Sequence, residues 1–171
     1  MAPAGASMIE LLSTQQLAQS ADAIRLGEVT AQWSSWDPQK KMVYTYVKLK
    51  VSETVKGQAH EEILIKQPGG EVGNVGMRVH GMAVFKKGER ALVFLKKGDG
   101  DYPSLVGMSQ GKYRVVRDRE TGEDQALFEA PRDAEFYHKN ERGVARELSV
   151  QSVRKRQSLR SLIEEIRKEQ R

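Results

Sequence analysis

Cysteine is absent from this chain of 171 residues. Without thiols the protein cannot form disulfides, zinc–thiolate sites or iron–sulfur clusters, and it has no cysteine nucleophile. It also lacks any run of about 18 apolar residues, the length that marks a candidate membrane-spanning helix. Folding must therefore rest on an ordinary buried core, which a chain of this length can form because it buries about two-thirds of its unfolded surface.

The histidine spacings of common zinc sites are missing as well. The histidines His60, His80 and His138 lie far apart, and no His-x-x-x-His or His-Glu-x-x-His spacing is present, so no zinc site is indicated. The sequence thus indicates no catalytic residue, cofactor or metal site, although a pair of carboxylates from distant segments stays open.

Charge is plentiful but unevenly distributed. Charged residues make up 30% of the chain and apolar residues 39%, which fits a modest core with a heavily charged surface. The net charge is +5, and from Pro131 onward there are eleven Lys and Arg against seven Asp and Glu. The surplus therefore bears on partners rather than on the fold. No signal peptide is visible, and residues 1–10 are expected to be a leader, or a start that replaced a cleaved signal.

Two helices are predicted, one near each end. Ser13 and Gln16 have the spacing of a capping box, which predicts a short helix ending near residues 21–22. Residues 149–171 are predicted to form a second, basic helix. Its apolar residues share one face: Leu159, Leu162, Ile163 and Ile166. An isolated helix of this length is marginal in water, so this face must dock on a surface.

The middle of the chain has the pattern of β-structure. Residues 42–54 alternate between apolar and polar side chains, as in a strand with one buried face. Residues 91–95 are apolar throughout, which indicates a strand buried on both faces. About six short strands with turn signals between them predict a small barrel or sandwich over residues 11–130. Residues 131–148 are predicted to be an irregular connection.

The glycine-rich stretch 69–81 is the most unusual feature. Gly70, Gly73 and Gly76 recur at every third position, and Arg78 follows them. A phosphate-binding loop would need a helix directly after its glycines, and no helix signal follows here. The stretch is therefore either a plain loop with positive-φ positions or a partner-binding loop with these four residues as contacts.

Two further clusters are candidate partner-binding sites. The first is an aromatic group at a predicted hairpin: Trp33, Trp36, Tyr44 and Tyr46. Lysines continue the same strand, a pattern that can stack the bases of single-stranded nucleic acid, although cross-strand packing is the favoured explanation. The second is a basic patch: Arg154, Lys155, Arg156 and Arg160. It is either a solvated helix face or a site for acidic protein, anionic lipid or nucleic acid.

Three segments resemble the netrin-like domains, a group that includes the tissue inhibitors of metalloproteinases. They are Ala21–Val29, Tyr44–Val51 with the following Val55-Lys56-Gly57, and Phe85–Leu95. The chain is also similar to exported bacterial proteins that carry these segments, a glycine-rich loop and no cysteine. The resemblance implies an OB-type barrel of five strands and an exported protein. The inhibitors chelate zinc through an N-terminal cysteine, which this chain lacks, so no functional residue is carried over.

The predicted fold is mainly β: a small OB-like barrel of five to six strands with a short N-terminal helix and a C-terminal helix. The first functional hypothesis is a non-catalytic, exported protein-interaction or structural domain of the bacterial cell envelope, periplasmic or secreted. Its expected partner is another protein, either an envelope component or a second copy bound through the C-terminal helix. The alternative is a single-stranded nucleic-acid-binding domain of OB type, and the third hypothesis is a hydrolase with a dispersed carboxylate site.

Overall fold

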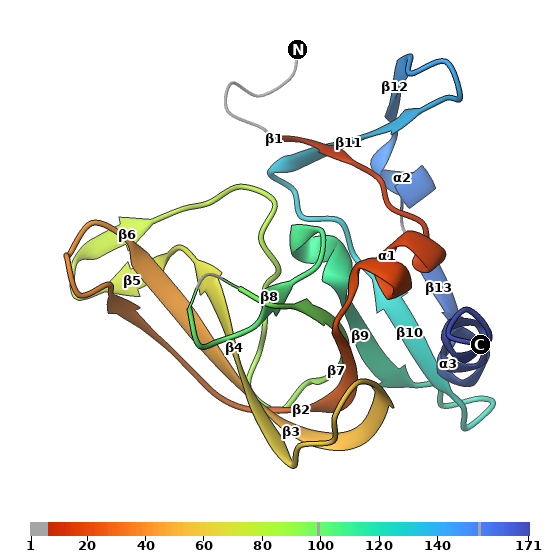
Figure 1. The fold of residues 1–171 in the computed structure, drawn as a ribbon, viewed down its shortest axis with the longest axis horizontal. Coiled ribbons are helices and arrows are strands. Elements are labelled where there is room, and N and C mark those ends of the chain that lie inside the picture. The colour runs from red at the N-terminus through yellow and green to blue at the C-terminus, as the bar shows by residue number, and fades with distance from the viewer. Residues whose placement is uncertain (1–6, 99, 154) are drawn as a thin grey trace.

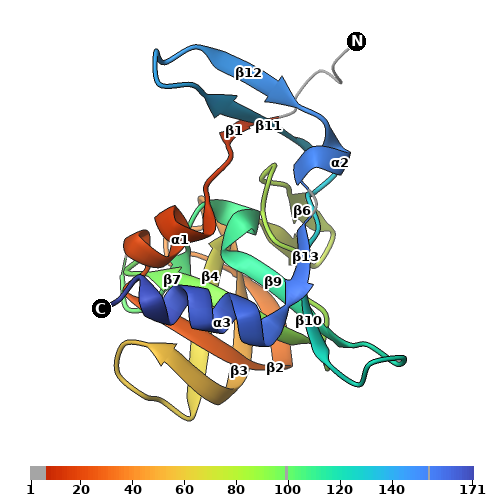
Figure 2. The same ribbon diagram turned by 90° about the vertical axis from the view of Figure 1, so that its right-hand side faces the viewer.

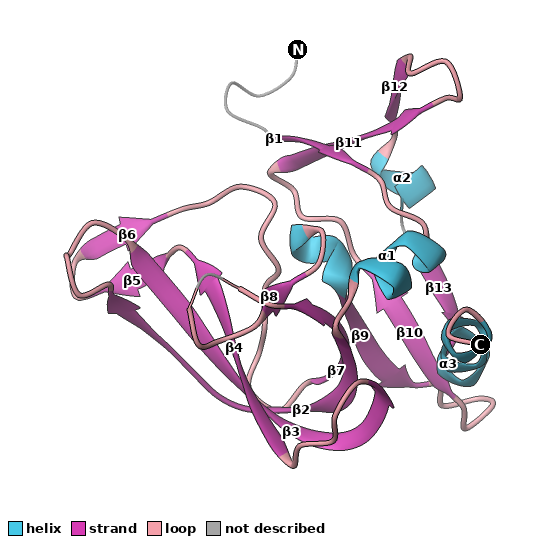
Figure 3. Cartoon of the chain, in the orientation of Figure 1, coloured by secondary structure: helices cyan, strands magenta, loops and turns pink. Residues whose placement is uncertain are grey.

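The computed structural model describes residues 7–98, 100–153 and 155–171 and shows a mainly β protein (Figures 1 and 3). The strands are β1 (Ser7–Glu10), β2 (Ala23–Trp36), β3 (Val43–Lys56), β4 (Glu62–Pro68), β5 (Gly70–Val72), β6 (Val75–Met77), β7 (Arg90–Lys96), β8 (Ser104–Leu105), β9 (Lys112–Arg117), β10 (Asp124–Phe128), β11 (Ala134–Lys139), β12 (Ala145–Leu148) and β13 (Lys155–Ser158). The α-helices are α1 (Thr14–Ser20), α2 (Val150–Val153) and α3 (Leu159–Lys168), and residues Met108–Gly111 form a 3-10 turn.

The prediction of a mainly β protein is confirmed, but the predicted number of strands is wrong. The described residues hold thirteen strands rather than five or six. Several of the additional strands have only two to four residues, such as β5, β6 and β8. Such short pieces cannot show a period-2 alternation, so their pairing depends on which neighbours the folded chain supplies.

One large antiparallel sheet curls into a half-barrel. Its strand order is β13-β10-β9-β7-β2-β3-β4, and β8 adds a short pairing to β7. The long strands β2 and β3 pair along their length with three register shifts, and bulges of this kind bend and twist a sheet. The free edge of β4 approaches β8, where the amide of Lys66 donates to the carbonyl of Pro103 at 3.0 Å. The curled sheet is visible in Figure 1.

The sheet separates two hydrophobic cores, and β7 contributes to both. Its residues Leu92 and Phe94 belong to the core under α1 and α3, whereas Ala91, Val93 and Leu95 belong to the core inside the curl. All five side chains are buried. The prediction that residues 91–95 form a strand buried on both faces is therefore confirmed.

The N-terminal helix starts as predicted. Ser13 is the N-cap of α1; its hydroxyl accepts from the amide of Gln16, and the Gln16 side chain accepts from the amide of Ser13. The C-terminal helix starts about ten residues later than predicted. Residues 155–158 form β13 instead, because they pair with β10. The apolar face of α3 is confirmed: Leu159, Leu162, Ile163 and Ile166 are buried against the rest of the same chain.

Two small sheets complete the fold. The prediction that residues 131–148 are irregular is wrong, because they contain β11 and β12, which join β1 in a three-stranded sheet. This sheet projects from the body of the protein (Figure 2). The glycine-rich stretch forms the β5–β6 hairpin rather than a plain loop. None of the helices that the structure describes has the length and hydropathy needed to cross a membrane.

Candidate functional site

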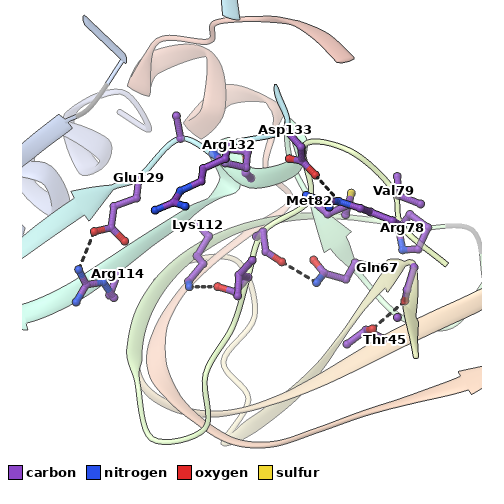
Figure 4. Close-up of a pocket in the computed structure, with 18 of the residues that line it drawn as sticks. Thr45, Gln67, Arg78, Val79, Met82, Lys112, Arg114, Glu129, Arg132 and Asp133 are labelled. Carbon is purple, nitrogen blue, oxygen red and sulfur yellow. Dashed lines mark hydrogen bonds and ion pairs between the residues drawn. The ribbon is translucent and has the colours of Figure 1, made fainter. Parts of the chain in front are cut away.

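A pocket of about 520 Å³ lies between the glycine-rich hairpin and strands β9 and β10 (Figure 4). Its volume falls within the range of about 300–1,000 Å³ that is typical of ligand sites. Apolar side chains form much of its wall: Met77, Val79, Met82, Val84, Leu127, Ala130 and Pro131. Four cations and two carboxylates also line it: Arg78, Lys112, Arg114, Arg132, Glu129 and Asp133.

The sheet register explains why the pocket is charged on one side. Ala91 and Val93 of β7 face the core inside the curl, and they lie opposite Arg114 and Lys112 of β9. Residues that lie directly opposite each other share a sheet face. The inner face is therefore apolar on β7 and becomes basic on β9, where the half-barrel opens into the pocket.

Lys112 is the most deeply held cation of the pocket. Its Nζ lies 2.6 Å from Glu89 Oε1, and the two side chains are only 11% and 10% exposed. The ammonium also donates to the carbonyl of Val84 and lies 4.7 Å from the ring centroid of Phe85. Burial lowers the pKa of Lys112 from 10.5, and the hydrogen bond that Lys112 donates to Glu89 opposes that change. Lys112 thus holds the Val84 segment against β9.

Asp133 anchors the segment that follows the β5–β6 hairpin at the rim of the pocket. Its Oδ1 accepts from the amide of Gly81 at 3.2 Å, and its Oδ2 accepts from Arg78 Nε at 3.1 Å. His80 Nδ1 lies 3.6 Å from the same Oδ2, which is too far for a hydrogen bond. Burial acts to raise the pKa of Asp133, but Gly81 and Arg78 outweigh it and hold the pKa below 3.8.

Two buried oxygens in the pocket lining have no hydrogen-bond partner in the described part of the chain. Gln67 Nε2 donates to the carbonyl of Ala83 at 2.9 Å, which orients the amide and leaves Oε1 unpaired. The hydroxyl of Ser109 is also unpaired. These residues are only 7% and 5% exposed. Because buried polar atoms are normally hydrogen-bonded, these two oxygens mark the part of the pocket that a ligand would complete.

The predicted glycine site is only partly assembled. Gly70 and Arg78 line the pocket, whereas Gly73 and Gly76 do not. Gly70 has φ +135°, and a Cβ there would lie 2.3 Å from the hydroxyl of Ser34. Gly73 has φ +62° in the β5–β6 turn and faces open space. Gly70 is therefore required for close packing, and Gly73 for the turn.

The predicted aromatic cluster is divided between the two faces of the sheet. Trp33 lies opposite Tyr46, and Ser35 lies opposite Tyr44, so these aromatics share one face. Trp36 lies opposite the buried Val43 and belongs to the other face. The rings of Trp33 and Tyr46 are stacked with centroids 5.7 Å apart, and Trp33 is 45% exposed. Cross-strand packing is thus present, together with an exposed ring.

The described residues of the predicted basic patch lie on two elements, with Lys155 and Arg156 in β13 and Arg160 in α3. Arg156 lies in β13 and pairs with Asp118 at 3.0 Å. Arg160 lies in α3 and lines a different pocket, of about 450 Å³, beside Ile163. Arg154 lies outside the described residues.

Sequence reasoning missed most of the pocket. Gln67, Ser109, Lys112 and Asp133 lie on separate elements, and Gln67 and Asp133 look ordinary in their own segments. Two signals were present in the sequence: the glycines on either side of Ser109, at positions 107 and 111, and the polar position of Lys112 on a strand next to the apolar β7. Sheet pairing was needed to turn these signals into a site.

The described residues of the pocket do not assemble a common hydrolytic centre. Gly107-Met108-Ser109-Gln110-Gly111 has the Gly-x-Ser-x-Gly spacing of a nucleophile elbow, but it lies at a 3-10 turn between β8 and β9 rather than between a strand and a helix. Ser109 also has no hydrogen-bonded base, because its hydroxyl has no partner among the residues that the structure describes. Within residues 7–98, 100–153 and 155–171, no three His, Asp or Glu side chains come close enough to hold a metal ion together. What the arrangement offers is an apolar wall, a basic rim and two unpaired oxygens, which suit binding.

No family model matches the chain, and no curated protein matches it in sequence. The chemistry of the pocket therefore carries the functional conclusion.

Proposed function

We propose that this protein is a non-catalytic binding domain of the bacterial cell envelope that engages another protein through the pocket beneath the β5–β6 hairpin. The observation that carries the proposal is the pair of unpaired, buried oxygens of Gln67 and Ser109 in a pocket of about 520 Å³. Leaving a buried acceptor unsatisfied costs roughly 1–3 kcal/mol. A bound partner that donates to them recovers this cost.

The composition of the wall favours a polypeptide ligand. Met77 and Met82 line the pocket beside Leu127, and methionine is unbranched and adapts to irregular apolar surfaces. A basic rim next to an apolar wall fits a segment with both apolar and polar groups. The resemblance to netrin-like domains supports an OB-type barrel in an exported protein, periplasmic or secreted.

A blocking variant tests this proposal. Val84 lines the pocket and is 70% exposed, so Val84→Trp fills the mouth without disturbing a core. Val75→Trp is the matched control, because Val75 is 42% exposed on β6 and does not line the pocket. Wild type and both variants serve as baits in a quantitative pull-down from envelope extract of the native source. Thermal melting checks that all three are folded.

The expected result is a partner retained by wild type and Val75→Trp and lost from Val84→Trp. Equal recovery by all three baits would place the contact elsewhere. Recovery of nothing above background by wild type would remove the stable-partner proposal.

A second candidate function rests on the exposed aromatic face. Trp33 stacks on Tyr46, Tyr102 packs edge-on to Tyr46 at 5.7 Å, and Lys66 lies 4.1 Å from the ring centroid of Tyr44. Exposed rings beside lysines suit the stacking of single-stranded nucleic acid. Titration of labelled oligonucleotides at low salt should then show micromolar binding that weakens steeply with salt and with Trp33→Ala. A flat titration would end this alternative.

A second copy bound through the C-terminal helix is not part of the proposal. The apolar face that such an interface would need is buried within the same chain: Leu159, Leu162, Ile163 and Ile166.

A further inference from the structure

The charges around the pocket do not balance. Arg78 pairs with Asp133 at 3.1 Å, and Arg114 pairs with Glu129 at 2.8 Å. Lys112 pairs with a carboxylate outside the lining. Arg132 is exposed and has no ion-pair partner within the described ranges. Figure 4 shows Arg132 reaching over the pocket on the side of Glu129. The rim therefore has one guanidinium left over to receive an anion.

The interior of the pocket requires a hydrogen-bond donor rather than an anion. Gln67 Oε1 is an amide oxygen and can only accept a hydrogen bond. The hydrogen bond that Nε2 donates to the carbonyl of Ala83 fixes the orientation of the amide. The hydroxyl of Ser109 can accept or donate. A ligand that satisfies both must therefore carry at least one N–H or O–H donor on its buried side.

Part of the pocket wall is apolar. Met77, Met82 and Leu127 line the pocket together with the arginines and with the two residues that carry the unpaired oxygens. Both oxygens are covered in the absence of a ligand. A ligand reaches them by displacing lining side chains, and unbranched methionines move at low cost.

We infer that the pocket takes the free C-terminal end of a partner polypeptide. This one group combines what the pocket lacks: backbone N–H donors for Gln67 Oε1, apolar side chains for the methionine wall, and a terminal carboxylate for Arg132. Capture of a C-terminal carboxylate is a recurring mode of peptide recognition. The planar fork of arginine suits two parallel hydrogen bonds to a carboxylate. The inference rests on the proposed function and names the ligand of that same pocket.

Paired probes isolate the carboxylate. A pool of N-acetylated tripeptides ending in Leu, Val, Met or Phe is prepared twice, once as free acids and once as C-terminal amides. The two pools differ only in the terminal charge. Binding to the isotopically labelled full chain is followed by amide chemical-shift changes. The free-acid pool should bind at least about tenfold more tightly than the amide pool, a margin of the size expected for a charged hydrogen bond.

Three variants assign the contacts. Arg132→Gln should reduce free-acid binding to the level of the amide pool and leave amide binding unchanged. Arg119→Gln removes the same charge from an exposed turn residue that does not line this pocket, so it should preserve the preference for the acid. Gln67→Met removes the buried acceptor and should weaken both pools by the same factor.

The outcomes separate the inference from the proposed function. Equal binding of the two pools would overturn the C-terminal assignment and favour an internal segment, while pocket binding itself would stand. Absence of binding by both pools would also overturn it, even if the pull-down partner is still lost from Val84→Trp. Failure of the proposed function appears only in that pull-down, when Val84→Trp retains the partner.

Discussion

Removal of the buried cation at Lys112 is expected to destabilise the protein strongly. In Lys112→Met the apolar stem is kept and the ammonium is lost. Glu89 is 10% exposed and lies 2.6 Å from Nζ in the wild type. Among the described residues, its carboxylate then keeps the hydrogen bond from the amide of Lys86, at 2.9 Å, as its one remaining contact of this kind. Breaking a buried ion pair by removing one member costs about 3–5 kcal/mol, because an unpaired charge stays buried. The lower end of about 3 kcal/mol is expected, since the Lys86 contact remains.

A double-mutant cycle shows whether the charge pair itself is responsible. The free energy of unfolding is measured by urea titration with circular dichroism for wild type, Lys112→Met, Glu89→Gln and the double variant. The double variant buries no charge here, so it should be more stable than the sum of the single losses by about 2 kcal/mol. In thermal melting, Lys112→Met should lower the midpoint by about 6–12 °C, from roughly 2–4 °C per kcal/mol for a chain of this size.

The reasoning would be refuted by a loss under about 1 kcal/mol together with additive single effects. That result is typical of a solvated surface pair. It would mean that water reaches the pair more freely than the exposures of 11% and 10% indicate.

Three further predictions concern glycine geometry and titration. Gly70→Ala should lower the free energy of unfolding by more than about 2 kcal/mol, because its Cβ would lie 2.3 Å from a neighbouring hydroxyl. Gly73 faces open space at φ +62°, so Gly73→Ala should lower it by about 1 kcal/mol. Similar urea midpoints for the two variants would contradict this prediction. The pKa of Asp133 is held below 3.8 in the folded state. Its stabilisation of the fold is therefore present above about pH 4 and is lost as the pH falls through the folded pKa. Asp133→Asn should show a weaker acid dependence of the unfolding free energy, and parallel curves for wild type and variant would count against this prediction. Burial raises the pKa of Tyr113 from 10.0 to about 12. Its contribution of roughly 3 kcal/mol is therefore fully present below pH 10 and is lost as the pH rises toward 12. Tyr113→Phe should be less sensitive to alkali in the same assay, and an unchanged alkaline loss would assign the effect to other groups.

Local sequence determined the elements whose signals are short-range. The capping box of Ser13 and Gln16 begins α1 because both hydrogen bonds lie within one helical turn. The alternation over residues 42–54 became β3, since period 2 places one set of side chains on the buried face. The spacing of the four apolar residues of α3 marked its buried face for the same kind of reason, with period 3.6.

Tertiary structure decided what depended on long-range pairing. Residues 155–158 became β13 because β10 offered an edge to pair with. Trp36 was separated from Tyr44 and Tyr46 by sheet register, which a list of residues along the chain does not contain. The pocket joins Gln67, Ser109 and Asp133 from separate parts of the chain. Only the curl of the sheet brings such residues together, because local propensity carries no information about which distant strands become neighbours.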